Sequence, residues 1–120
     1  MSHTRKSAEK RGRQAEFIAA MFLRMKGYRV LENRYRSKRG EIDIIAQRGN
    51  TTAFIEVKAR KTVDDALYSL SFRQRRRIEA AAEDWIKKTQ FSEGSLRFDI
   101  IAVAPKQIPS HITDAWRIGE

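Results

Sequence analysis

The chain has 120 residues, with 25 Lys and Arg against 15 Asp and Glu, a formal net charge of +10 and no cysteine. This length suits a single domain over residues 1–120 with one modest core, in which residues 1–10 form a flexible basic N-terminus. The missing cysteine excludes disulfides, thiolate zinc sites and cysteine nucleophiles, and with only His3 and His111 as imidazoles, histidine-centred catalysis is disfavoured.

The first predicted element is a helix from Ser7 to Lys26, which Gly27 ends in the C′ position. Its main apolar stripe consists of Ile18, Met21, Phe22 and Met25. A narrower stripe on nearly the opposite side, which would let the helix be covered from two directions, consists of Gly12, Glu16, Ala19, Ala20 and Leu23. Glu16 is the only charge in these stripes, and spacing alone fits a site residue and a solvated glutamate at a frayed helix start equally well.

A first strand is predicted from Tyr28 to Arg36, followed by a basic turn and then by two apolar runs around the turn dipeptide Gly49-Asn50. These runs, residues 41–46 and 53–58, predict an antiparallel hairpin. With Gly49 and Asn50 as a two-residue loop, four charged residues share one face, on which Asp43 opposes Glu56 and Glu41 opposes Lys58. Near the loop Ile45 opposes Phe54, so the sheet is buried on both sides, and the other face carries Ile42, Ile44, Ala53, Ile55 and Val57.

Asp43 and Glu56 are the most informative pair in this hairpin. Directly opposed residues have Cβ atoms roughly 4.5 to 5.5 Å apart, close enough for two carboxylates to bind one cation. The alternative is a structural network in which Lys58 balances Glu41 and Asp43 caps the strand. That alternative leaves the opposed acids unexplained.

The second half of the chain predicts one more helix and two strands. Lys61 to Leu70 has no clear period and is expected to be a loop or a short irregular turn. Ser71 and Gln74 fit a capping box for a helix that runs to about Thr89. Its predicted buried face is Ile78, Ala81, Ala82, Trp85 and Ile86.

Leu96 to Ala104 predicts a buried strand that Asp99 interrupts, and Ile112 to Ile118 predicts a short edge strand. The expected fold class is therefore α/β, with a mixed central sheet flanked by helices in the order α-β-β-β-α-β(-β).

The spacing of Asp43, Glu56 and Lys58, together with a glutamate in the leading helix, resembles the active-site pattern of the PD-(D/E)xK nuclease superfamily. More narrowly, the chain is similar to the YraN family of small bacterial proteins, which are related in fold to archaeal Holliday-junction resolvases. Residues that carry this likeness span about 10 to 105 and include Gly12, Glu16, Gly27-Tyr28, 39–45, 54–60, Arg77-Ile78 and 97–99. Glu-Ile stands before Asp43 where the superfamily name would place a proline, and this departure removes no ligand.

The resemblance implies a restriction-endonuclease-like fold and a deoxyribonuclease that depends on Mg²⁺ or Mn²⁺. Asp43 and Glu56 are the expected metal ligands, since oxygen donors suit these hard cations, and the Val57 carbonyl is added by resemblance. Lys58 would orient the attacking water or stabilise the phosphate, Glu16 would act as an outer ligand or water-positioning acid, and Glu41 would pair with Lys58 or support the metal shell.

The net charge makes nucleic acid, most simply DNA, the expected partner. Four arginines crowd the first turns of the second long helix, where the macrodipole disfavours cations unless a phosphate is bound, and Gln74 and Arg77 are the candidates for facing the site. Solvated arginines are the alternative. The predicted nucleic-acid contacts are Arg36, Lys38, Arg39, Arg60, Lys61, Arg73, Gln74, Arg75, Arg76 and Arg77. Arg34, at the start of the same basic turn, is a further candidate.

A membrane partner is not expected, because the basic residues are spread over several elements and no run approaches the roughly 18 apolar residues of a membrane span. With no apolar signal stretch, a cytoplasmic protein is predicted. Two functions stay open: a DNA nuclease, selective for branched or flapped substrates, and a non-catalytic DNA- or RNA-binding protein that keeps the nuclease fold. A carboxylate-pair glycosidase fits the charge poorly. Cleavage of branched DNA requires paired sites, so a homodimer is expected by analogy.

Overall fold

Five strands and three helices make up the computed structural model, which describes residues 3–91 and 93–120, and side chains from residue 10 onward. In chain order the elements are α1 (His3–Met25), β1 (Arg29–Arg36), β2 (Glu41–Arg48), β3 (Thr51–Lys58), α2 (Val63–Tyr68), α3 (Phe72–Thr89), β4 (Ser95–Ala102) and β5 (Ser110–Trp116). This confirms the predicted α/β class and element order, with α2 as an addition. Of the predicted flexible N-terminus, residues 1 and 2 lie outside the described part, and α1 already begins at His3.

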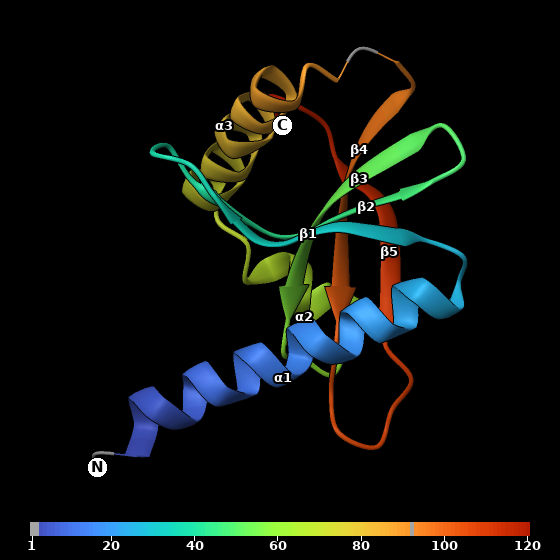
Figure 1. Ribbon diagram of the computed structural model, residues 1–120. Coiled ribbons are helices and arrows are strands. Elements are labelled where there is room, and N and C mark those ends of the chain that lie inside the picture. Colours follow the sequence, from blue (N-terminus) through green and yellow to red (C-terminus); the bar gives the residue numbers. More distant parts are fainter. Residues whose placement is uncertain (1–2, 92) are drawn as a thin grey trace.

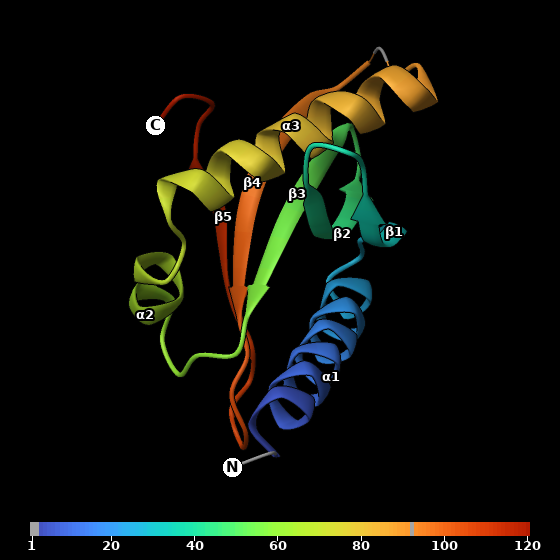
Figure 2. The same cartoon turned by 90° about the vertical axis from the view of Figure 1, so that its left-hand side faces the viewer.

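The strands form a single sheet in the order β1-β2-β3-β4-β5. All neighbours are antiparallel except β3 and β4, which run parallel and are joined by the crossover through α2 and α3. Figures 1 and 2 show α1 on one side of the sheet and α3 on the other. The sheet is therefore buried on both faces, as the apolar strands predicted.

The buried side of α1 is the narrower of the two predicted stripes. Ala19 and Leu23 are fully buried, whereas Ile18 and Met21 of the predicted main stripe are exposed by 43% and 46%, and Met25 by 84%. The prediction failed because alanines let the helix approach the sheet closely, so small side chains outcompete large ones for this contact. The cluster beneath α1 consists mainly of Ala15, Ala19, Ala20, Leu23, Tyr28, Ile44, Ala53, Ile55 and Ile101.

The α3 face agrees with the sequence. Ser71 and Gln74 form the reciprocal capping box, which fixes the start of the helix at Phe72. Trp85 is a core residue, as predicted, and its indole N–H donates to Glu32 at 3.2 Å. It lies in an aromatic cluster with Phe54, Phe91, Phe98 and Trp116.

The segment from Lys61 to Leu70 is not the irregular loop that the sequence predicted. It contains α2, whose N-cap Thr62 accepts a hydrogen bond from the Asp65 N–H at 3.0 Å. Ala66 and Leu70 are buried against the α3 side of the sheet. A helix of six residues is too short to display a hydrophobic period, which explains the error.

Asp99, which interrupts the apolar run of β4, is fully buried. Arg97 donates two hydrogen bonds of 2.8 Å to its carboxylate, and His111 Nε2 and the Asp114 N–H lie 2.8 and 2.9 Å away. Burial alone would raise the pKa of Asp99, but the hydrogen bonds from His111 and Arg97 outweigh it and lower that pKa. Asp99 thus ties β4 to the edge strand β5.

No helix in the described residues is long and apolar enough to cross a membrane.

Candidate active site

The candidate site lies where β2 separates from β3. Their ladder runs from Arg48↔Thr51 to Ile44↔Ile55, in the predicted register, and ends there. Beyond this point the Oδ2 atom of Asp43 accepts a hydrogen bond of 2.8 Å from the backbone N–H of Val57. Figure 1 shows β2 continuing with β1 toward α3, away from β3. The Asp43 side chain therefore takes the place of the backbone group that would form the next hydrogen bond of the ladder.

This separation corrects two predicted pairings. Asp43 and Glu56 are not ladder partners, and Glu41 pairs with Arg36 in β1 instead of with Lys58. The Arg36 guanidinium Nε lies 3.6 Å from the Glu41 carboxylate. The two-residue turn fixed the register near the loop only, because strong strand twist can break a ladder further along.

The predicted face of Ile42 was wrong for the same reason. It packs in the core under α3, whereas Ile44 packs in the core under α1, so the two do not share a face. The twist of β2 between these positions aims the intervening Asp43 at the gap between the strands.

Three acids, Glu16, Asp43 and Glu56, meet at this gap, and the pKa of each is raised. Burial, and next the neighbouring Asp43 carboxylate, raise the pKa of Glu56 to about 8. Burial and Asp43 also raise the pKa of Glu16. Burial raises the pKa of Asp43 too, against the hydrogen bonds from Val57 and Glu56. In the metal-free chain at neutral pH, the proton on Glu56 relieves the repulsion between Glu56 and Asp43.

Lys58 lies beside this group. Its Nζ is 3.4 Å from Glu56 Oε2, and both side chains are largely buried, with exposures of 15% and 14%. The ammonium faces the acids from the β3 side. Sequence alone placed these two residues on one face, and the ion pair agrees with that placement.

Glu16 reaches the gap from α1, and Arg34 holds it there. Arg34 Nε lies 3.3 Å from Glu16 Oε1, and the Arg34 backbone has φ of 55°, a left-handed conformation that L residues rarely adopt. The sequence placed Arg34 only in a basic turn, since no local signal predicts this conformation for an arginine. It is the positioning residue that sequence reasoning missed.

Above the acids is a cavity of about 220 Å³. Its lining residues come from β2, β3 and α3 and are Glu41, Asp43, Glu56, Gln74, Arg77 and Ile78. Gln74 and Arg77 thus face the site, as the sequence indicated. The β1–β2 turn packs tightly against this part of α3, since a Cβ on Gly40 would overlap the carbonyl oxygen of Arg77.

The other arginines at the start of α3 have different surroundings. Arg76 binds Glu79 with contacts of 2.6 and 2.8 Å and also donates to the Glu120 carbonyl. The Arg75 guanidinium lies over the rings of Phe72 and Trp116. Both point toward the C-terminus, and neither lines the acidic cavity.

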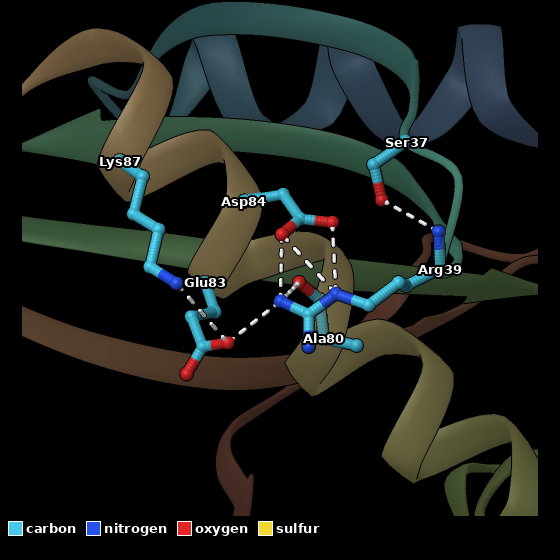
Figure 3. Close-up of polar contacts among 6 residues, drawn as sticks. All are labelled: Ser37, Arg39, Ala80, Glu83, Asp84 and Lys87. Atoms are coloured by element: carbon cyan, nitrogen blue, oxygen red, sulfur yellow. Dashed lines mark hydrogen bonds and ion pairs between the residues drawn. The ribbon is translucent and has the colours of Figure 1, made fainter.

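Arg39, a predicted nucleic-acid contact, binds acids of α3 while its side chain stays half exposed. Figure 3 shows its guanidinium bridging Asp84 and Glu83, with its closest contacts to each at 2.6 Å, and it also reaches the Ala80 carbonyl. The hydrogen bond from Arg39 is the main cause of the lowered pKa of both acids. The predicted contacts that are exposed are Arg36, Lys38, Arg39, Arg60, Lys61, Arg73 and Arg77, and Arg36 lies beside Glu41.

The donors at the gap suit a hard divalent cation. Asp43 and Glu56 offer carboxylate oxygens, and Val57 offers its carbonyl, which points the same way as its N–H in an extended strand and so faces Asp43. In the described part of the chain, no three or more His, Asp or Glu side chains form a ready metal-binding group. A site with two protein carboxylates and several waters fits Mg²⁺, which rarely takes an all-protein cage.

Comparisons with known proteins decide the family. The model of "Uncharacterised protein family UPF0102" matches residues 15–103. The chain belongs to UPF0102. UPF0102 relatives include a Sinorhizobium medicae protein, 51% identical over 91% of this chain and 90% of its own length, and an Agrobacterium fabrum protein, 46% identical over 96% and 95%. A third UPF0102 protein, from Paramagnetospirillum magneticum, is 44% identical over 98% of this chain and 95% of its own. The matched range contains Glu16 and all residues of the acidic gap.

Proposed function

We propose that this UPF0102 protein is a metal-dependent nuclease that hydrolyses phosphodiester bonds in DNA. The observation that carries the proposal is the gathering of Asp43, Glu56 and Lys58 at the β2–β3 separation, beneath a cavity that Arg77 also lines. Buried acids cost free energy unless they bind something, and a divalent cation with a phosphate would use all of these groups. The likeness to the YraN family and the PD-(D/E)xK superfamily supports the same activity.

Each residue has a distinct role in this proposal. Mg²⁺ or Mn²⁺, held by Asp43, Glu56 and the Val57 carbonyl, would supply Lewis acidity and a more acidic water. Lys58 donates to the attacking water or to the phosphate oxygens. Glu16, held by Arg34, accepts a hydrogen bond from the attacking water.

Substrate DNA is held from the α3 side and by exposed cations. Arg77 and Gln74 reach the phosphate across the cavity. Lys38, Arg60, Lys61 and Arg73 bind the flanking backbone, giving salt-dependent affinity without sequence readout. Branched or flapped DNA is the proposed preferred substrate.

The second candidate is a non-catalytic nucleic-acid-binding protein. It is favoured by the state of the acids, since a pKa of about 8 leaves Glu56 largely protonated at neutral pH in the metal-free chain. Only the nuclease gives Asp43 and Glu56 a role near phosphates, so it remains the first choice.

The test is cleavage of linear, single-stranded, flapped and four-way DNA with Mg²⁺ or Mn²⁺, beside Glu56→Ala and Glu83→Ala. Glu83 is an exposed acid bound to Arg39, so its variant controls for the loss of one charge. Cleavage by the wild type and by Glu83→Ala, but not by Glu56→Ala, is expected. If no substrate is cut faster by the wild type than by Glu56→Ala, the binding function replaces the nuclease.

A further inference from the structure

The outer face of α1 exposes an apolar surface that the proposed function does not use. Four of the nine large apolar side chains exposed in the described residues lie on this helix: Phe17, Ile18, Met21 and Met25. Phe17 is 66% and Met25 84% exposed. Apolar side chains grouped in this way, rather than scattered singly, are typical of an interaction site. Methionine is common at such surfaces because its flexible side chain adapts to a partner.

This surface continues into a groove between α1 and the ends of β3 and β4. The groove has a volume of about 950 Å³ and an apolar lining that includes Ala15, Phe17, Ile18, Val103, Ala104 and Pro105. It is concave, so it suits an inserted segment of chain better than a flat bilayer or a rigid duplex. Ala59, next to Lys58, also lines it, which places the groove beside the candidate active site.

Among the side chains that the structure describes, the charged residues that line the groove are all cations. Lys10 and Arg11 line it, and Arg24 is exposed near the far end of the apolar surface. Glu16 is the only acid between residues 10 and 26, and it points to the acidic gap and binds Arg34. A partner therefore meets cations at both ends of an apolar centre.

These charges favour a partner unlike the chain itself. In an antiparallel pair of α1 helices, Lys10 and Arg11 of one copy would approach Arg24 of the other, and a parallel pair would place like residues together. Both arrangements bring cations against cations. DNA would satisfy the cations but leave the apolar centre without a partner. An acidic segment with apolar anchor side chains matches both features.

We infer that this groove docks an acidic, amphipathic segment of another protein, whose apolar side chains enter between α1 and Pro105. The segment binds as a helix in a groove, with anchors at helical spacing and carboxylates toward Lys10, Arg11 and Arg24. Affinity comes from the apolar anchors, and preference for the partner comes from the charges.

The test uses the full chain and two labelled peptides of about four helical turns, with leucines at helical spacing and either glutamates or lysines elsewhere. Fluorescence anisotropy should show micromolar binding of the glutamate peptide and at least about tenfold weaker binding of the lysine peptide. The double variant Phe17→Ser with Met21→Ser should bind the glutamate peptide about tenfold or more weakly than the wild type does. Tyr68→Ser, which removes an aromatic side chain 92% exposed on α2, is the matched control and should bind normally.

Arg11→Glu should narrow or reverse the preference between the two peptides. Equal binding of both peptides, or binding of neither, overturns the inference. The inference is also overturned if the chain binds phosphatidylglycerol vesicles or a single-stranded oligonucleotide more tightly than the glutamate peptide, and if the Phe17 and Met21 double variant abolishes that binding. Dimerisation in sedimentation velocity that the same double variant removes also overturns it, in favour of a second copy. Circular dichroism of each variant confirms that the fold is intact.

Discussion

The carboxylate of Asp43 accepts a hydrogen bond of 2.8 Å from the backbone N–H of Val57, at the position where the β2–β3 ladder would otherwise continue. This contact keeps the strands apart and leaves one edge of each strand facing the acids. The separation of the strands and the gathering of the acids are thus one structural event. A side chain at position 43 that cannot accept this hydrogen bond is expected to disturb both.

Metal binding should stabilise the fold through Asp43 and Glu56. A ligand that binds only the native state raises the free energy of unfolding, so Mn²⁺ or Mg²⁺ should raise the Tm by several degrees. Asp43→Asn should abolish the rise, since a neutral amide is a weak ligand for these ions. Asp84→Asn changes an acid bound to Arg39 and should keep the response. If neither ion changes the Tm of the wild type, the metal site is contradicted.

The stability of the metal-free protein should fall as pH rises from about 5 to about 8. The pKa of Glu56 is about 8 in the native state against an ordinary 4.5, so the native state binds more protons than the unfolded state across this interval. Raised pKa values of Asp43 and Glu16 act in the same direction. Urea unfolding at several pH values should show the decline, and Glu56→Gln should reduce it.

Glu83→Gln serves as the control for that titration. The pKa of Glu83 is lowered by its hydrogen bond from Arg39, so its contribution is present above its unfolded pKa and is lost only in more acidic solution. The slope between about pH 5 and 8 should therefore match that of the wild type. An identical slope in Glu56→Gln would show that Glu56 does not titrate there.

Two adjacent arginines should differ in DNA binding. Arg77 lines the cavity above the acids, whereas Arg76 binds Glu79 and the Glu120 carbonyl. Arg77→Ala should weaken binding of a labelled flapped DNA and reduce its salt dependence by about one phosphate contact, with Arg76→Ala close to the wild type. Anisotropy titrations at several salt concentrations measure both. Equal losses would mean that α3 binds DNA by charge alone.

Gly40→Ala should destabilise the fold and damage the site together. Its new Cβ would overlap the Arg77 carbonyl oxygen, forcing the β1–β2 turn and α3 apart at a cost of about 1 to 3 kcal/mol. Gly49→Ala is the comparison, since Gly49 has φ of 60° but open space around it, and should cost only about 1 kcal/mol. Chemical denaturation gives both values. A neutral Gly40→Ala would disprove the tight packing.

Asp99→Asn should be more costly than a comparable change on the surface. It removes the buried charge that Arg97 and His111 bind, and breaking such a group typically costs about 3 to 5 kcal/mol. Asp114→Asn loses only an exposed pair with Arg117 and should cost less than about 1 kcal/mol. Urea denaturation of both variants tests the difference.

Much of the fold could be predicted from the sequence because local signals and the global fold agree. The capping box at Ser71, the turn at Gly49 and the apolar runs each specify one element and its register near a turn. What failed depends on contacts between distant segments. Which stripe of α1 is buried depends on how closely the helix approaches the sheet, and periodicity does not encode that distance.

The candidate site divides in the same way. Asp43, Glu56 and Lys58 could be placed together from strand alternation and a turn. The loss of ladder pairing at Asp43, the left-handed Arg34 and the binding of Arg39 to α3 could not, because each depends on the twist of β1 and β2 toward α3. Arginine is equally suited to phosphate and to carboxylate, so the sequence cannot assign its partner.

The contacts of Arg39 and Gly40 with α3 restrict how the candidate site can open. The β1–β2 turn is joined to α3 through Asp84, Glu83 and the Arg77 backbone, so these segments are expected to move as one rigid body. Glu41, Gln74 and Arg77 therefore keep their relative positions when a substrate arrives. Widening of the entrance is therefore expected on the opposite side, where α1 carries Glu16 and the ion pair with Arg34 joins that side chain to β1.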